Sequence, residues 1–402
     1  MGSLLGRPDP RRITRRTALS VLGLGATGLF AACAQAPSAA PASASAALTA
    51  APPAPVAPSP SAAAAKPRWG MSAAQDAAWQ QIEAAAKKEG KLTYYTLGSI
   101  PANQVERFRS LWKADYPEIE IEYLNVGNNA QLNTRIITEQ ESKTVVGDVA
   151  DIAVRSVLLL KPEFLEPFIP PAAQDPSVKW LTNPVADPGR KGLVTADFAQ
   201  FFAVWTNSNL VKAADAPKTL MDVATNPKWK GQIIWRSPWT TGGGNHTFLF
   251  AKQVYGMDWV TKMQAQSPTF ADDQDAALLQ VARGEFAIGI GLTGRAAGQL
   301  IKDKQPIAPV WPEDFAITIT SGTPILSRSP HPNAAKVFAN WMLTERGQTL
   351  WRDLGQFPLR ADILPTEPWM QGASKAKQVF ENLLPAAPQQ ASLDEAARFF
   401  KK

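Results

Sequence analysis

The chain has 402 residues, with 41 Lys or Arg against 35 Asp or Glu, and 45% of its residues are hydrophobic. Its formal charge of +6 is concentrated at the N-terminus, where five arginines and Asp9 precede the only cysteine, Cys33, and leave the rest of the chain at about +2. A balance this close to neutral gives no support to nucleic-acid binding, and we expect no nucleic-acid partner.

Residues 1–33 have the pattern of an export signal. Five arginines between Arg7 and Arg16 are followed by a short run of small and apolar residues that ends at Cys33. This run is shorter than the roughly 20 apolar residues that cross a bilayer. TRRTALS resembles the bacterial twin-arginine export motif, but Ala18 stands where that motif usually has an aromatic residue. General secretion therefore stays open as the export route.

The sequence FAAC, which ends at Cys33, resembles the lipobox of bacterial lipoproteins, with Phe30 where Leu is commoner. The resemblance implies cleavage before Cys33 and lipid attachment to it. A lone cysteine cannot form an internal disulfide, which gives the lipid further support. The alternative is that Cys33 is a small residue at the end of an uncleaved anchor. We expect a lipid-anchored protein in the periplasm or cell envelope.

Residues 34–70 consist almost wholly of Ala, Pro and Ser. Such a segment buries too little apolar surface to offset its ordering entropy, so we expect a disordered tether. It would reach about 30 Å as a coil and about 100 Å if extended. The tether would hold the remaining, larger part of the chain beside a membrane.

The next residues alternate between helix and strand patterns. Three strands alternating with helices imply a parallel sheet with crossover connections. The expected elements are a helix at 72–90, a strand at 91–97, a helix at 101–117, a strand at 118–126, a helix at 130–142 and a strand at 151–156.

The alternation restarts after residue 200. Two α/β units joined by extended segments place a ligand crevice between them, since open α/β sheets bind at the carboxyl ends of their strands. The expected strands are 201–207, 231–237 and 286–292, the helices are 245–256, 273–285, 295–304, 332–343 and 345–355, and the extended segments are 306–312 and 314–327.

Three stretches of the sequence, taken together and in this order, match the pattern of a known protein family. They are DAPKTLMDVATNPKWKGQIIW, VARGEFAIGIG, and ILSRSPHPNAAKVFANWMLTERGQTLWRDLGQFPLRADI. Together they resemble the extracellular solute-binding proteins of bacterial ABC importers, in the type II periplasmic-binding class that includes ferric-iron binders. The resemblance covers roughly residues 90–365. It implies an α/β, two-lobed type II periplasmic-binding-protein fold, in which each lobe is a mixed, mostly parallel sheet flanked by helices and the ligand cleft lies at the hinge.

The resemblance also implies approximate lobe boundaries and a function. We expect lobe 1 to comprise 71–198 plus 312–340, and lobe 2 to comprise 199–311 plus 341–402. The protein would be a monomer without a cofactor that captures a small solute and delivers it to an ABC permease in the cytoplasmic membrane. A sensory binding protein and an exported enzyme stay open as alternatives, although the chain has no GxSxG or GxxxxGK[ST] motif.

The ferric-iron alternative has little support in the residues. Where family members carry a tyrosine pair, this chain has Gly294 and Arg295, and the family's acidic iron ligand falls near Ser156. His246 and His331 show no metal-ligand spacing. We expect no metal site of that kind, although a cation site that uses Asp272 or Asp273 stays open.

The same positions supply positive charge and hydrogen-bond donors, which favours an anionic organic ligand. The glycines at 242–244 allow close backbone approach, and Asn245 is placed to cap a helix whose first N–H groups attract anions. Arg295, with Arg155 or Ser156, would clamp an acidic group. The expected ligand-binding residues are Ser99, Arg155, Ser156, Trp239, Thr240, Thr241, Gly242, Gly243, Asn245, Asp273 and Arg295.

Each of these positions also has a purely structural interpretation. The glycines would then form only a tight turn, and Arg295 would lie on a solvated helix face. Asp273 would cap the helix that follows it, and Arg155 would pair with a carboxylate of the protein. Most of the 13 tryptophans must be packing residues, so Trp239 has the same alternative.

Overall fold

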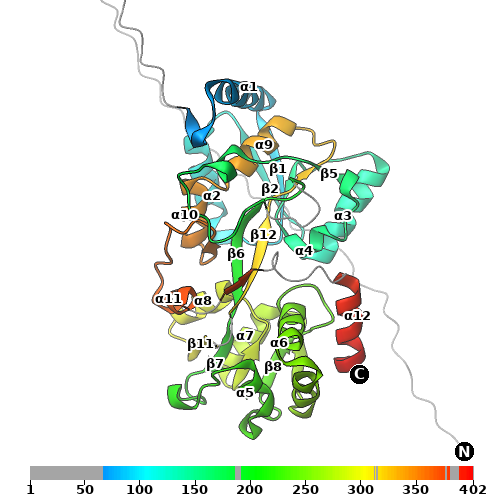
Figure 1. The fold of residues 1–402 in the computed structure, drawn as a ribbon, viewed down its shortest axis with the longest axis vertical. Helices are drawn as coiled ribbons and strands as arrows, with labels where there is room; N and C mark the ends of the chain where they lie inside the picture. The colour runs from blue at the N-terminus through cyan, green and yellow to red at the C-terminus, as the bar shows by residue number, and fades with distance from the viewer. Residues whose placement is uncertain are drawn as a thin grey trace, which may run out of the picture. The chain divides into compact units, whose positions relative to one another are not determined.

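The computed structural model describes residues 67–185, 192–311, 313, 316–375, 378–380 and 389–401. Of these, the side chains of residues 295, 316–320, 373–380 and 389 are not described. The expected export signal, Cys33 and nearly all of the expected tether lie outside the described residues. The described residues form two lobes connected by long strands (Figure 1).

The first lobe is built on a five-stranded sheet with the strand order β2-β1-β3-β13-β5. β1 pairs in parallel with both β2 and β3, as the alternation of strands and helices predicts. β13 returns from the other lobe and pairs antiparallel with β3 and β5. The strands are β1 (Lys91–Thr96), β2 (Glu120–Asn125), β3 (Val149–Ala150), β5 (Leu165–Glu166) and β13 (Ile325–Leu326).

Helices cover this sheet and bury an aromatic core. At the start of α1, Ser72 and Gln75 form a capping box, and Gly90 ends the helix at a φ of 67°. The rings of Tyr94 and Phe338 lie 4.9 Å apart between the sheet and α9. The helices are α1 (Ala73–Glu89), α2 (Val105–Asp115), α3 (Asn129–Ser142), α4 (Val154–Val157), α9 (Pro332–Trp341) and α10 (Glu345–Asp353).

The position of α10 corrects the expected lobe boundary. We expect residues from 341 onward in lobe 2, but Trp351 of α10 and Leu354 directly after it are buried in the core of lobe 1. The Trp351 ring lies 4.1 Å from that of Phe198, which belongs to the same core. The helix remains with lobe 1 because its apolar face is complementary to that core, a property that chain order does not reveal.

The second lobe repeats the architecture around a sheet with the strand order β11-β7-β10-β8-β9. β8 pairs in parallel with β9 and β10, and β7 is antiparallel to β10. The strands are β7 (Val204–Asn207), β8 (Ile233–Arg236), β9 (Thr269–Ala271), β10 (Ile288–Ile290) and β11 (Ile307–Val310), and the helices are α5 (Leu220–Thr225), α6 (Gly243–Ala265), α7 (Gln274–Arg283), α8 (Gly294–Lys302) and α12 (Gln389–Phe400).

A third sheet connects the lobes. β6 begins near Phe198 in the core of lobe 1 and reaches Phe202 in the core of lobe 2, and β12 runs back beside it in the antiparallel direction. The expected boundary at residues 198 and 199 therefore falls inside a crossing strand. The sheet contains β4 (Ile152–Ala153), β6 (Ala196–Phe202), β12 (Ala316–Gly322), β14 (Phe357–Pro358) and β15 (Gln378–Phe380), and α11 (Pro368–Lys375) follows β14.

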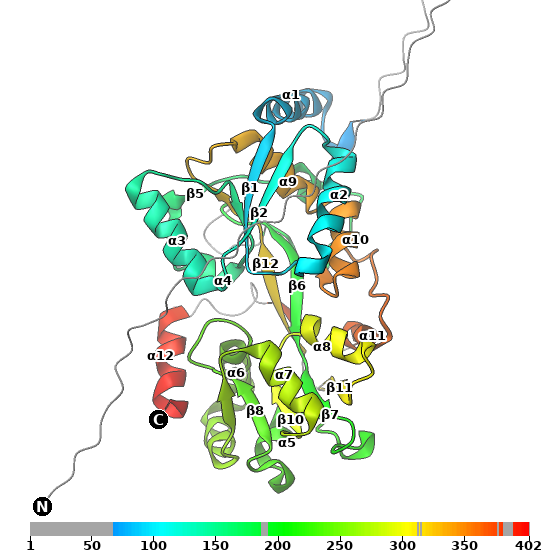
Figure 2. The same ribbon diagram turned by 180° about the vertical axis from the view of Figure 1, so that it is seen from behind.

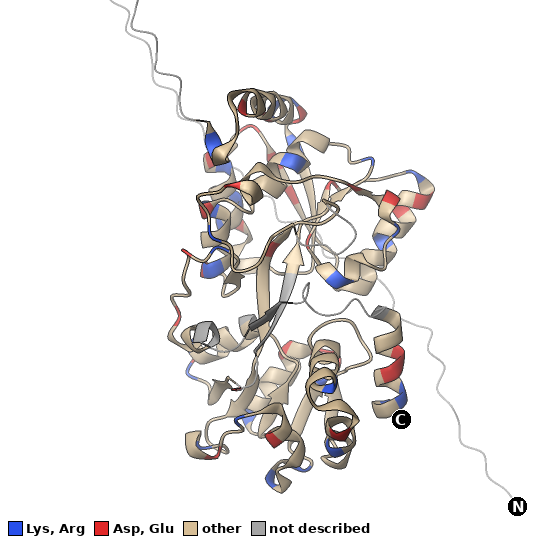
Figure 3. Ribbon diagram, viewed as in Figure 1, with Lys and Arg blue, Asp and Glu red and all other residues tan. Residues whose placement is uncertain are grey.

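Charged residues lie mainly on the outer elements of both lobes. Lys and Arg lie there among Asp and Glu (Figure 3). Among the described residues, no helix combines the length and the apolar character that a membrane span requires.

Candidate functional site

A cavity of about 490 Å³ lies between the lobes, beside the crossing strands. Its walls are mostly loops and helix starts that follow parallel strands of the two lobes, which is where open α/β sheets bind ligands. The described lining residues are Leu97, Gly98, Ser99, Gly127, Asn128, Asn129, Ala130 and Ala153 from lobe 1, Gln200, Phe202 and Ser321 from the crossing strands, and Arg236, Trp239, Thr240, Thr241, Gly242, Gly243, Asp272, Gln274, Thr293 and Leu393 from lobe 2.

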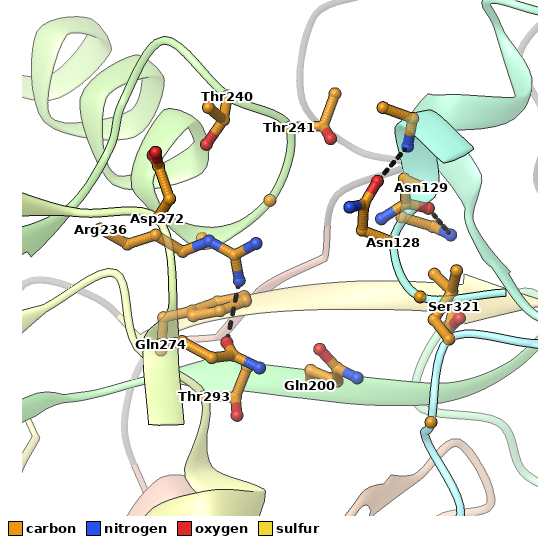
Figure 4. A pocket seen from close by; sticks show the side chains of 18 of the residues that line it. Asn128, Asn129, Gln200, Arg236, Thr240, Thr241, Asp272, Gln274, Thr293 and Ser321 are labelled. Carbon is orange, nitrogen blue, oxygen red and sulfur yellow. Dashed lines mark hydrogen bonds between the residues drawn. The ribbon is translucent and has the colours of Figure 1, made fainter. Parts of the chain in front are cut away.

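Arg236 ends strand β8 and is the only basic residue among the described lining residues. Its Nη1 donates a hydrogen bond of 2.9 Å to Oε1 of Gln274, a neutral partner, and its guanidinium group faces the space between the lobes (Figure 4). Burial lowers the pKa of Arg236, and the carboxylates of Asp272, Asp275 and Asp273 oppose this shift. Arg236 forms no ion pair with a described residue, although the three carboxylates are close enough to act on its charge.

Three glycines bring the start of α6 against this arginine. Gly242 has a φ of 115°, and a Cβ atom there would lie 3.4 Å from Cζ of Arg236. A Cβ atom on Gly243 would lie 2.2 Å from Phe202, and one on Gly244 would lie 2.0 Å from the Arg236 carbonyl oxygen. The positive φ therefore requires glycine at position 242, and close packing requires it at positions 243 and 244. This packing also places the N-terminus of a long helix at the cavity wall.

The opposite wall is uncharged and comes from the start of α3. Oδ1 of Asn128 accepts hydrogen bonds of 3.0 Å from the N–H groups of Ala130 and Gln131, which caps the helix. Oδ1 of the neighbouring Asn129 accepts a hydrogen bond of 3.2 Å from the N–H group of Ala153. Because both amide oxygens are engaged with backbone, the NH₂ groups are the parts of these side chains left for a ligand (Figure 4).

A buried carboxylate organises the hydroxyl groups of this wall. Asp151 is fully buried, accepts a hydrogen bond of 2.7 Å from Oγ of Ser321, and also accepts one from the hydroxyl of Ser99. Burial raises the pKa of Asp151, and these hydroxyl groups oppose the shift. Since each serine donates its proton to Asp151, its oxygen is presented to the cavity as an acceptor.

A sequence model of the bacterial extracellular solute-binding protein family matches residues 96–349. The chain belongs to this family. The matched range contains every described lining residue except Leu393. No protein of curated function matches the chain by sequence.

Solved structures of periplasmic binding proteins share the fold. The periplasmic binding protein P5PA is 17% identical, with a TM-score of 0.63 over 77% of this chain and 99% of that chain. Iron-bound HitA from Pseudomonas aeruginosa is 19% identical, with a TM-score of 0.60 over 77% of this chain and 98% of that one. AfuA from Actinobacillus pleuropneumoniae, with fructose-6-phosphate bound, is 18% identical, with a TM-score of 0.62 over 78% and 99%.

Six of the residues expected to bind ligand line the cavity of this solute-binding protein. Trp239 packs beside Phe270 at a ring distance of 4.8 Å, and Oγ1 of Thr240 donates to the Ser237 carbonyl oxygen at 2.9 Å. The six are Ser99, Trp239, Thr240, Thr241, Gly242 and Gly243.

Four of the other expected residues do not reach the described lining. The strand predicted at 151–156 ends at Ala153, so Arg155 and Ser156 are buried on the short helix α4. Asp273 caps α7 by accepting from the N–H groups at positions 275 and 276, in agreement with its structural interpretation. Asn245 was expected to cap α6, but the helix begins earlier, after Gly242, and the Asn245 side chain is fully buried.

Arg295 belongs to α8, and its side chain lies outside the described residues. Its expected contact with a ligand stays a prediction. The described residues contain no group of three or more His, Cys, Asp or Glu side chains that would hold a metal ion. No tyrosine is among the described lining residues.

The residues that the sequence analysis missed are Arg236, Asn128, Asn129 and Asp151. Arg236 falls within the strand expected at 231–237, six residues before Gly242, and its position in that strand gave no sign of a ligand contact. Asn128 did have a local signal, because an asparagine directly before a predicted helix is a common N-cap. The contact between Asp151 and Ser321 joins residues 170 positions apart, so no local pattern indicates it.

Proposed function

We propose that this protein is the substrate-binding component of an ABC importer, and that it captures a small anionic organic solute between its lobes. The observation that carries this proposal is Arg236, whose guanidinium group faces the cavity and whose hydrogen-bond partner among the described residues is the neutral Gln274. A carboxylate, phosphate or sulfonate group would form charge-assisted, bidentate hydrogen bonds with it. The N-terminus of α6 at the same wall favours the same charge.

The remainder of the cavity suits the uncharged part of such a solute. The NH₂ groups of Asn128 and Asn129 are donors, whereas the oxygens of Ser99 and Ser321 are acceptors. Hydroxyl groups can satisfy both kinds of partner. Asp272, the only described acidic lining residue, provides an acceptor for a ligand hydroxyl or amino group. We infer a hydroxylated organic acid or phosphate ester as the solute class.

Ligand capture would close the lobes around the crossing strands β6 and β12. The acid would bind Arg236 on lobe 2 while the hydroxyl groups bind lobe 1, so that the closed state makes more contacts with the solute than the open state. Only this difference in affinity drives closure. A cation-binding function is less supported, because Asp272 is the only described carboxylate at the cavity and Arg236 opposes a positive ligand.

The location that we propose completes this function. Cys33 would be lipidated after export, and residues 34–70 would tether the two lobes beside the permease as a monomer. A lipid anchor would keep the captured solute close to the membrane that imports it.

The test is a ligand screen followed by substitution of Arg236. Organic acids and sugar phosphates, including citrate and fructose 6-phosphate, are screened by thermal shift, and hits are measured by calorimetry. Arg236→Gln should weaken binding by about tenfold to a hundredfold, because a hydrogen bond to a charged group contributes about 1.5–3 kcal/mol. Arg107→Gln is the control, since Arg107 forms an ion pair with Asp353 on the surface of lobe 1.

Two results would contradict the proposal. One is a screen in which only metal ions or uncharged solutes bind. The other is an Arg236→Gln variant that binds the acidic hit as tightly as the Arg107→Gln control.

A further inference from the structure

The C-terminal helix α12 lies alongside α6 on lobe 2 in both views of the molecule (Figures 1 and 2). Its residues Ser392, Ala396 and Phe400 are spaced four apart, so they share one face of the helix, and all three are buried. Ala396 and Phe400 belong to the core of lobe 2, where the Phe400 ring lies 5.0 Å from that of Trp235. The helix is therefore an integral part of this lobe, although it lies outside the family match.

Ser392 connects this helix to the loop that lines the cavity. Nδ2 of the fully buried Asn245 donates a hydrogen bond of 2.8 Å to the carbonyl oxygen of Pro238. A carbonyl oxygen can only accept, so this bond fixes the orientation of the amide and turns its Oδ1 toward Ser392. The Ser392 hydroxyl donates to that oxygen at 3.0 Å.

The carbonyl group of Pro238, which Asn245 holds by this hydrogen bond, directly precedes the residues that form the cavity wall. Pro238 is followed by Trp239, Thr240, Thr241 and Gly242, all of which line the cavity. The next residue of α12 after Ser392 is Leu393, which lines the same cavity. One turn of this helix therefore both anchors the loop and contributes directly to the wall.

We propose that α12 holds the cavity-lining loop of residues 238–242 in place. In this arrangement Ser392 orients Asn245, and Asn245 in turn holds the carbonyl group of Pro238. This proposal rests on the proposed function in one respect, namely that the cavity between the lobes is the ligand site. Ser392 is a positioning residue, because its hydroxyl contacts Asn245 and is not itself part of the described lining. Removal of the hydroxyl leaves the Asn245 oxygen buried without a partner and frees the loop to move.

The test is hydrogen exchange of the ligand-free full chain, measured by mass spectrometry on peptides from residues 236–246 and 389–400. Ser392→Ala should speed amide exchange in residues 236–246 by about threefold to tenfold, which corresponds to the loss of one hydrogen bond. Ser392→Thr keeps the hydroxyl and should restore slow exchange. Gln390→Ala is the control on α12, since Gln390 bonds only to the exposed Asp394 in the described contacts.

A double-mutant cycle with Asn245→Leu separates this role from simple docking of the helix. If Ser392 acts through Asn245, then Ser392→Ala should add no further loop exchange in the Asn245→Leu background. Equal acceleration across 389–400 and 236–246 would assign Ser392 to helix docking and overturn the proposal. Unchanged loop exchange in Ser392→Ala would overturn it as well. Neither result depends on which solute binds, so a failed ligand screen does not affect this test.

Discussion

The two walls of the cavity differ in the interactions they offer. Lobe 2 presents the charged Arg236 and Asp272 together with the start of α6, whereas the polar side chains of the opposite wall are the amides of lobe 1 and the hydroxyl groups of Ser99 and of Ser321 at the end of β12. Charged groups select ligands by charge, and neutral donors and acceptors select them by the placement of hydroxyl groups. We propose from this comparison that lobe 2 would select the class of solute by its charge and that lobe 1 would select among members of that class.

The largest effect on the lobe 1 wall is expected from Asp151→Asn. The amide would present a donor where Asp151 now accepts from Ser99 and Ser321, so at least one buried hydroxyl would lose its partner. We expect stability to fall by about 1–3 kcal/mol. Affinity for an acidic hit should fall about tenfold, because both hydroxyl groups turn away from their present orientation.

Urea denaturation and calorimetry measure these two effects. If lobe 1 selects by hydroxyl placement, the affinity loss should be larger for a hydroxylated acid than for a plain acid of similar charge. An equal loss of affinity for both acids would contradict the idea that lobe 1 selects ligands by the placement of their hydroxyl groups.

Substitution of Asn128 is expected to have a smaller effect on affinity. Its two roles, capping α3 and donating a hydrogen bond to the ligand, can be separated. Asn128→Ala removes both the cap of α3 and the amide donor, and should reduce stability by about 1 kcal/mol. Asn128→Ser retains a capping oxygen, so its stability should stay near that of the original chain. Both variants should weaken binding of a hydroxylated acid by about threefold to tenfold in calorimetry. Full affinity in Asn128→Ser would show that the amide serves only as a cap.

The smallest effect on affinity is expected from Asp197, which is buried at the lobe 1 end of β6 and is not among the described lining residues. Its Oδ2 accepts a hydrogen bond of 2.6 Å from Thr323, and burial, followed by the charge of Asp151, raises the pKa of Asp197 well above its usual value. A carboxyl group whose folded pKa is raised favours the protonated folded state. Its contribution to stability is therefore present at low pH and is lost as pH rises from about 4 toward the folded pKa.

Asp197→Asn removes this titration. The difference in unfolding free energy between Asp197→Asn and the original chain should increase with pH, by at most about 1.4 kcal/mol per unit. Urea denaturation between pH 5 and pH 8 measures it, and affinity should change by less than about threefold. Parallel pH profiles for the two proteins would show that Asp197 is ionised throughout this range.

Local patterns predicted most of the elements of this chain. Ser72 and Gly90 mark the ends of α1, and the parallel pairing of β1 with β2 and β3 follows from the helices between them. The helix α12 was missed, although its alternation of small, apolar and charged residues is visible after residue 389. Gly242 and Gly243 were expected to bind ligand and do line the cavity. The structure gives these glycines local causes as well: a positive φ at Gly242, and close contacts with the Phe202 ring at Gly243 and with the Arg236 carbonyl oxygen at Gly244.

The sequence by itself determined the alternation of helices and strands, the two-lobed class and the loop from Trp239 to Gly243, because caps, glycines and apolar periodicity act over a few residues. Only the tertiary structure decided which distant groups meet. Asp151 lies beside Ser321 and Asn245 beside Ser392 because crossing strands and packed helices bring together residues 170 and 147 positions apart. Such contacts depend on the burial and orientation of whole elements, and those properties are not encoded in any short stretch of sequence.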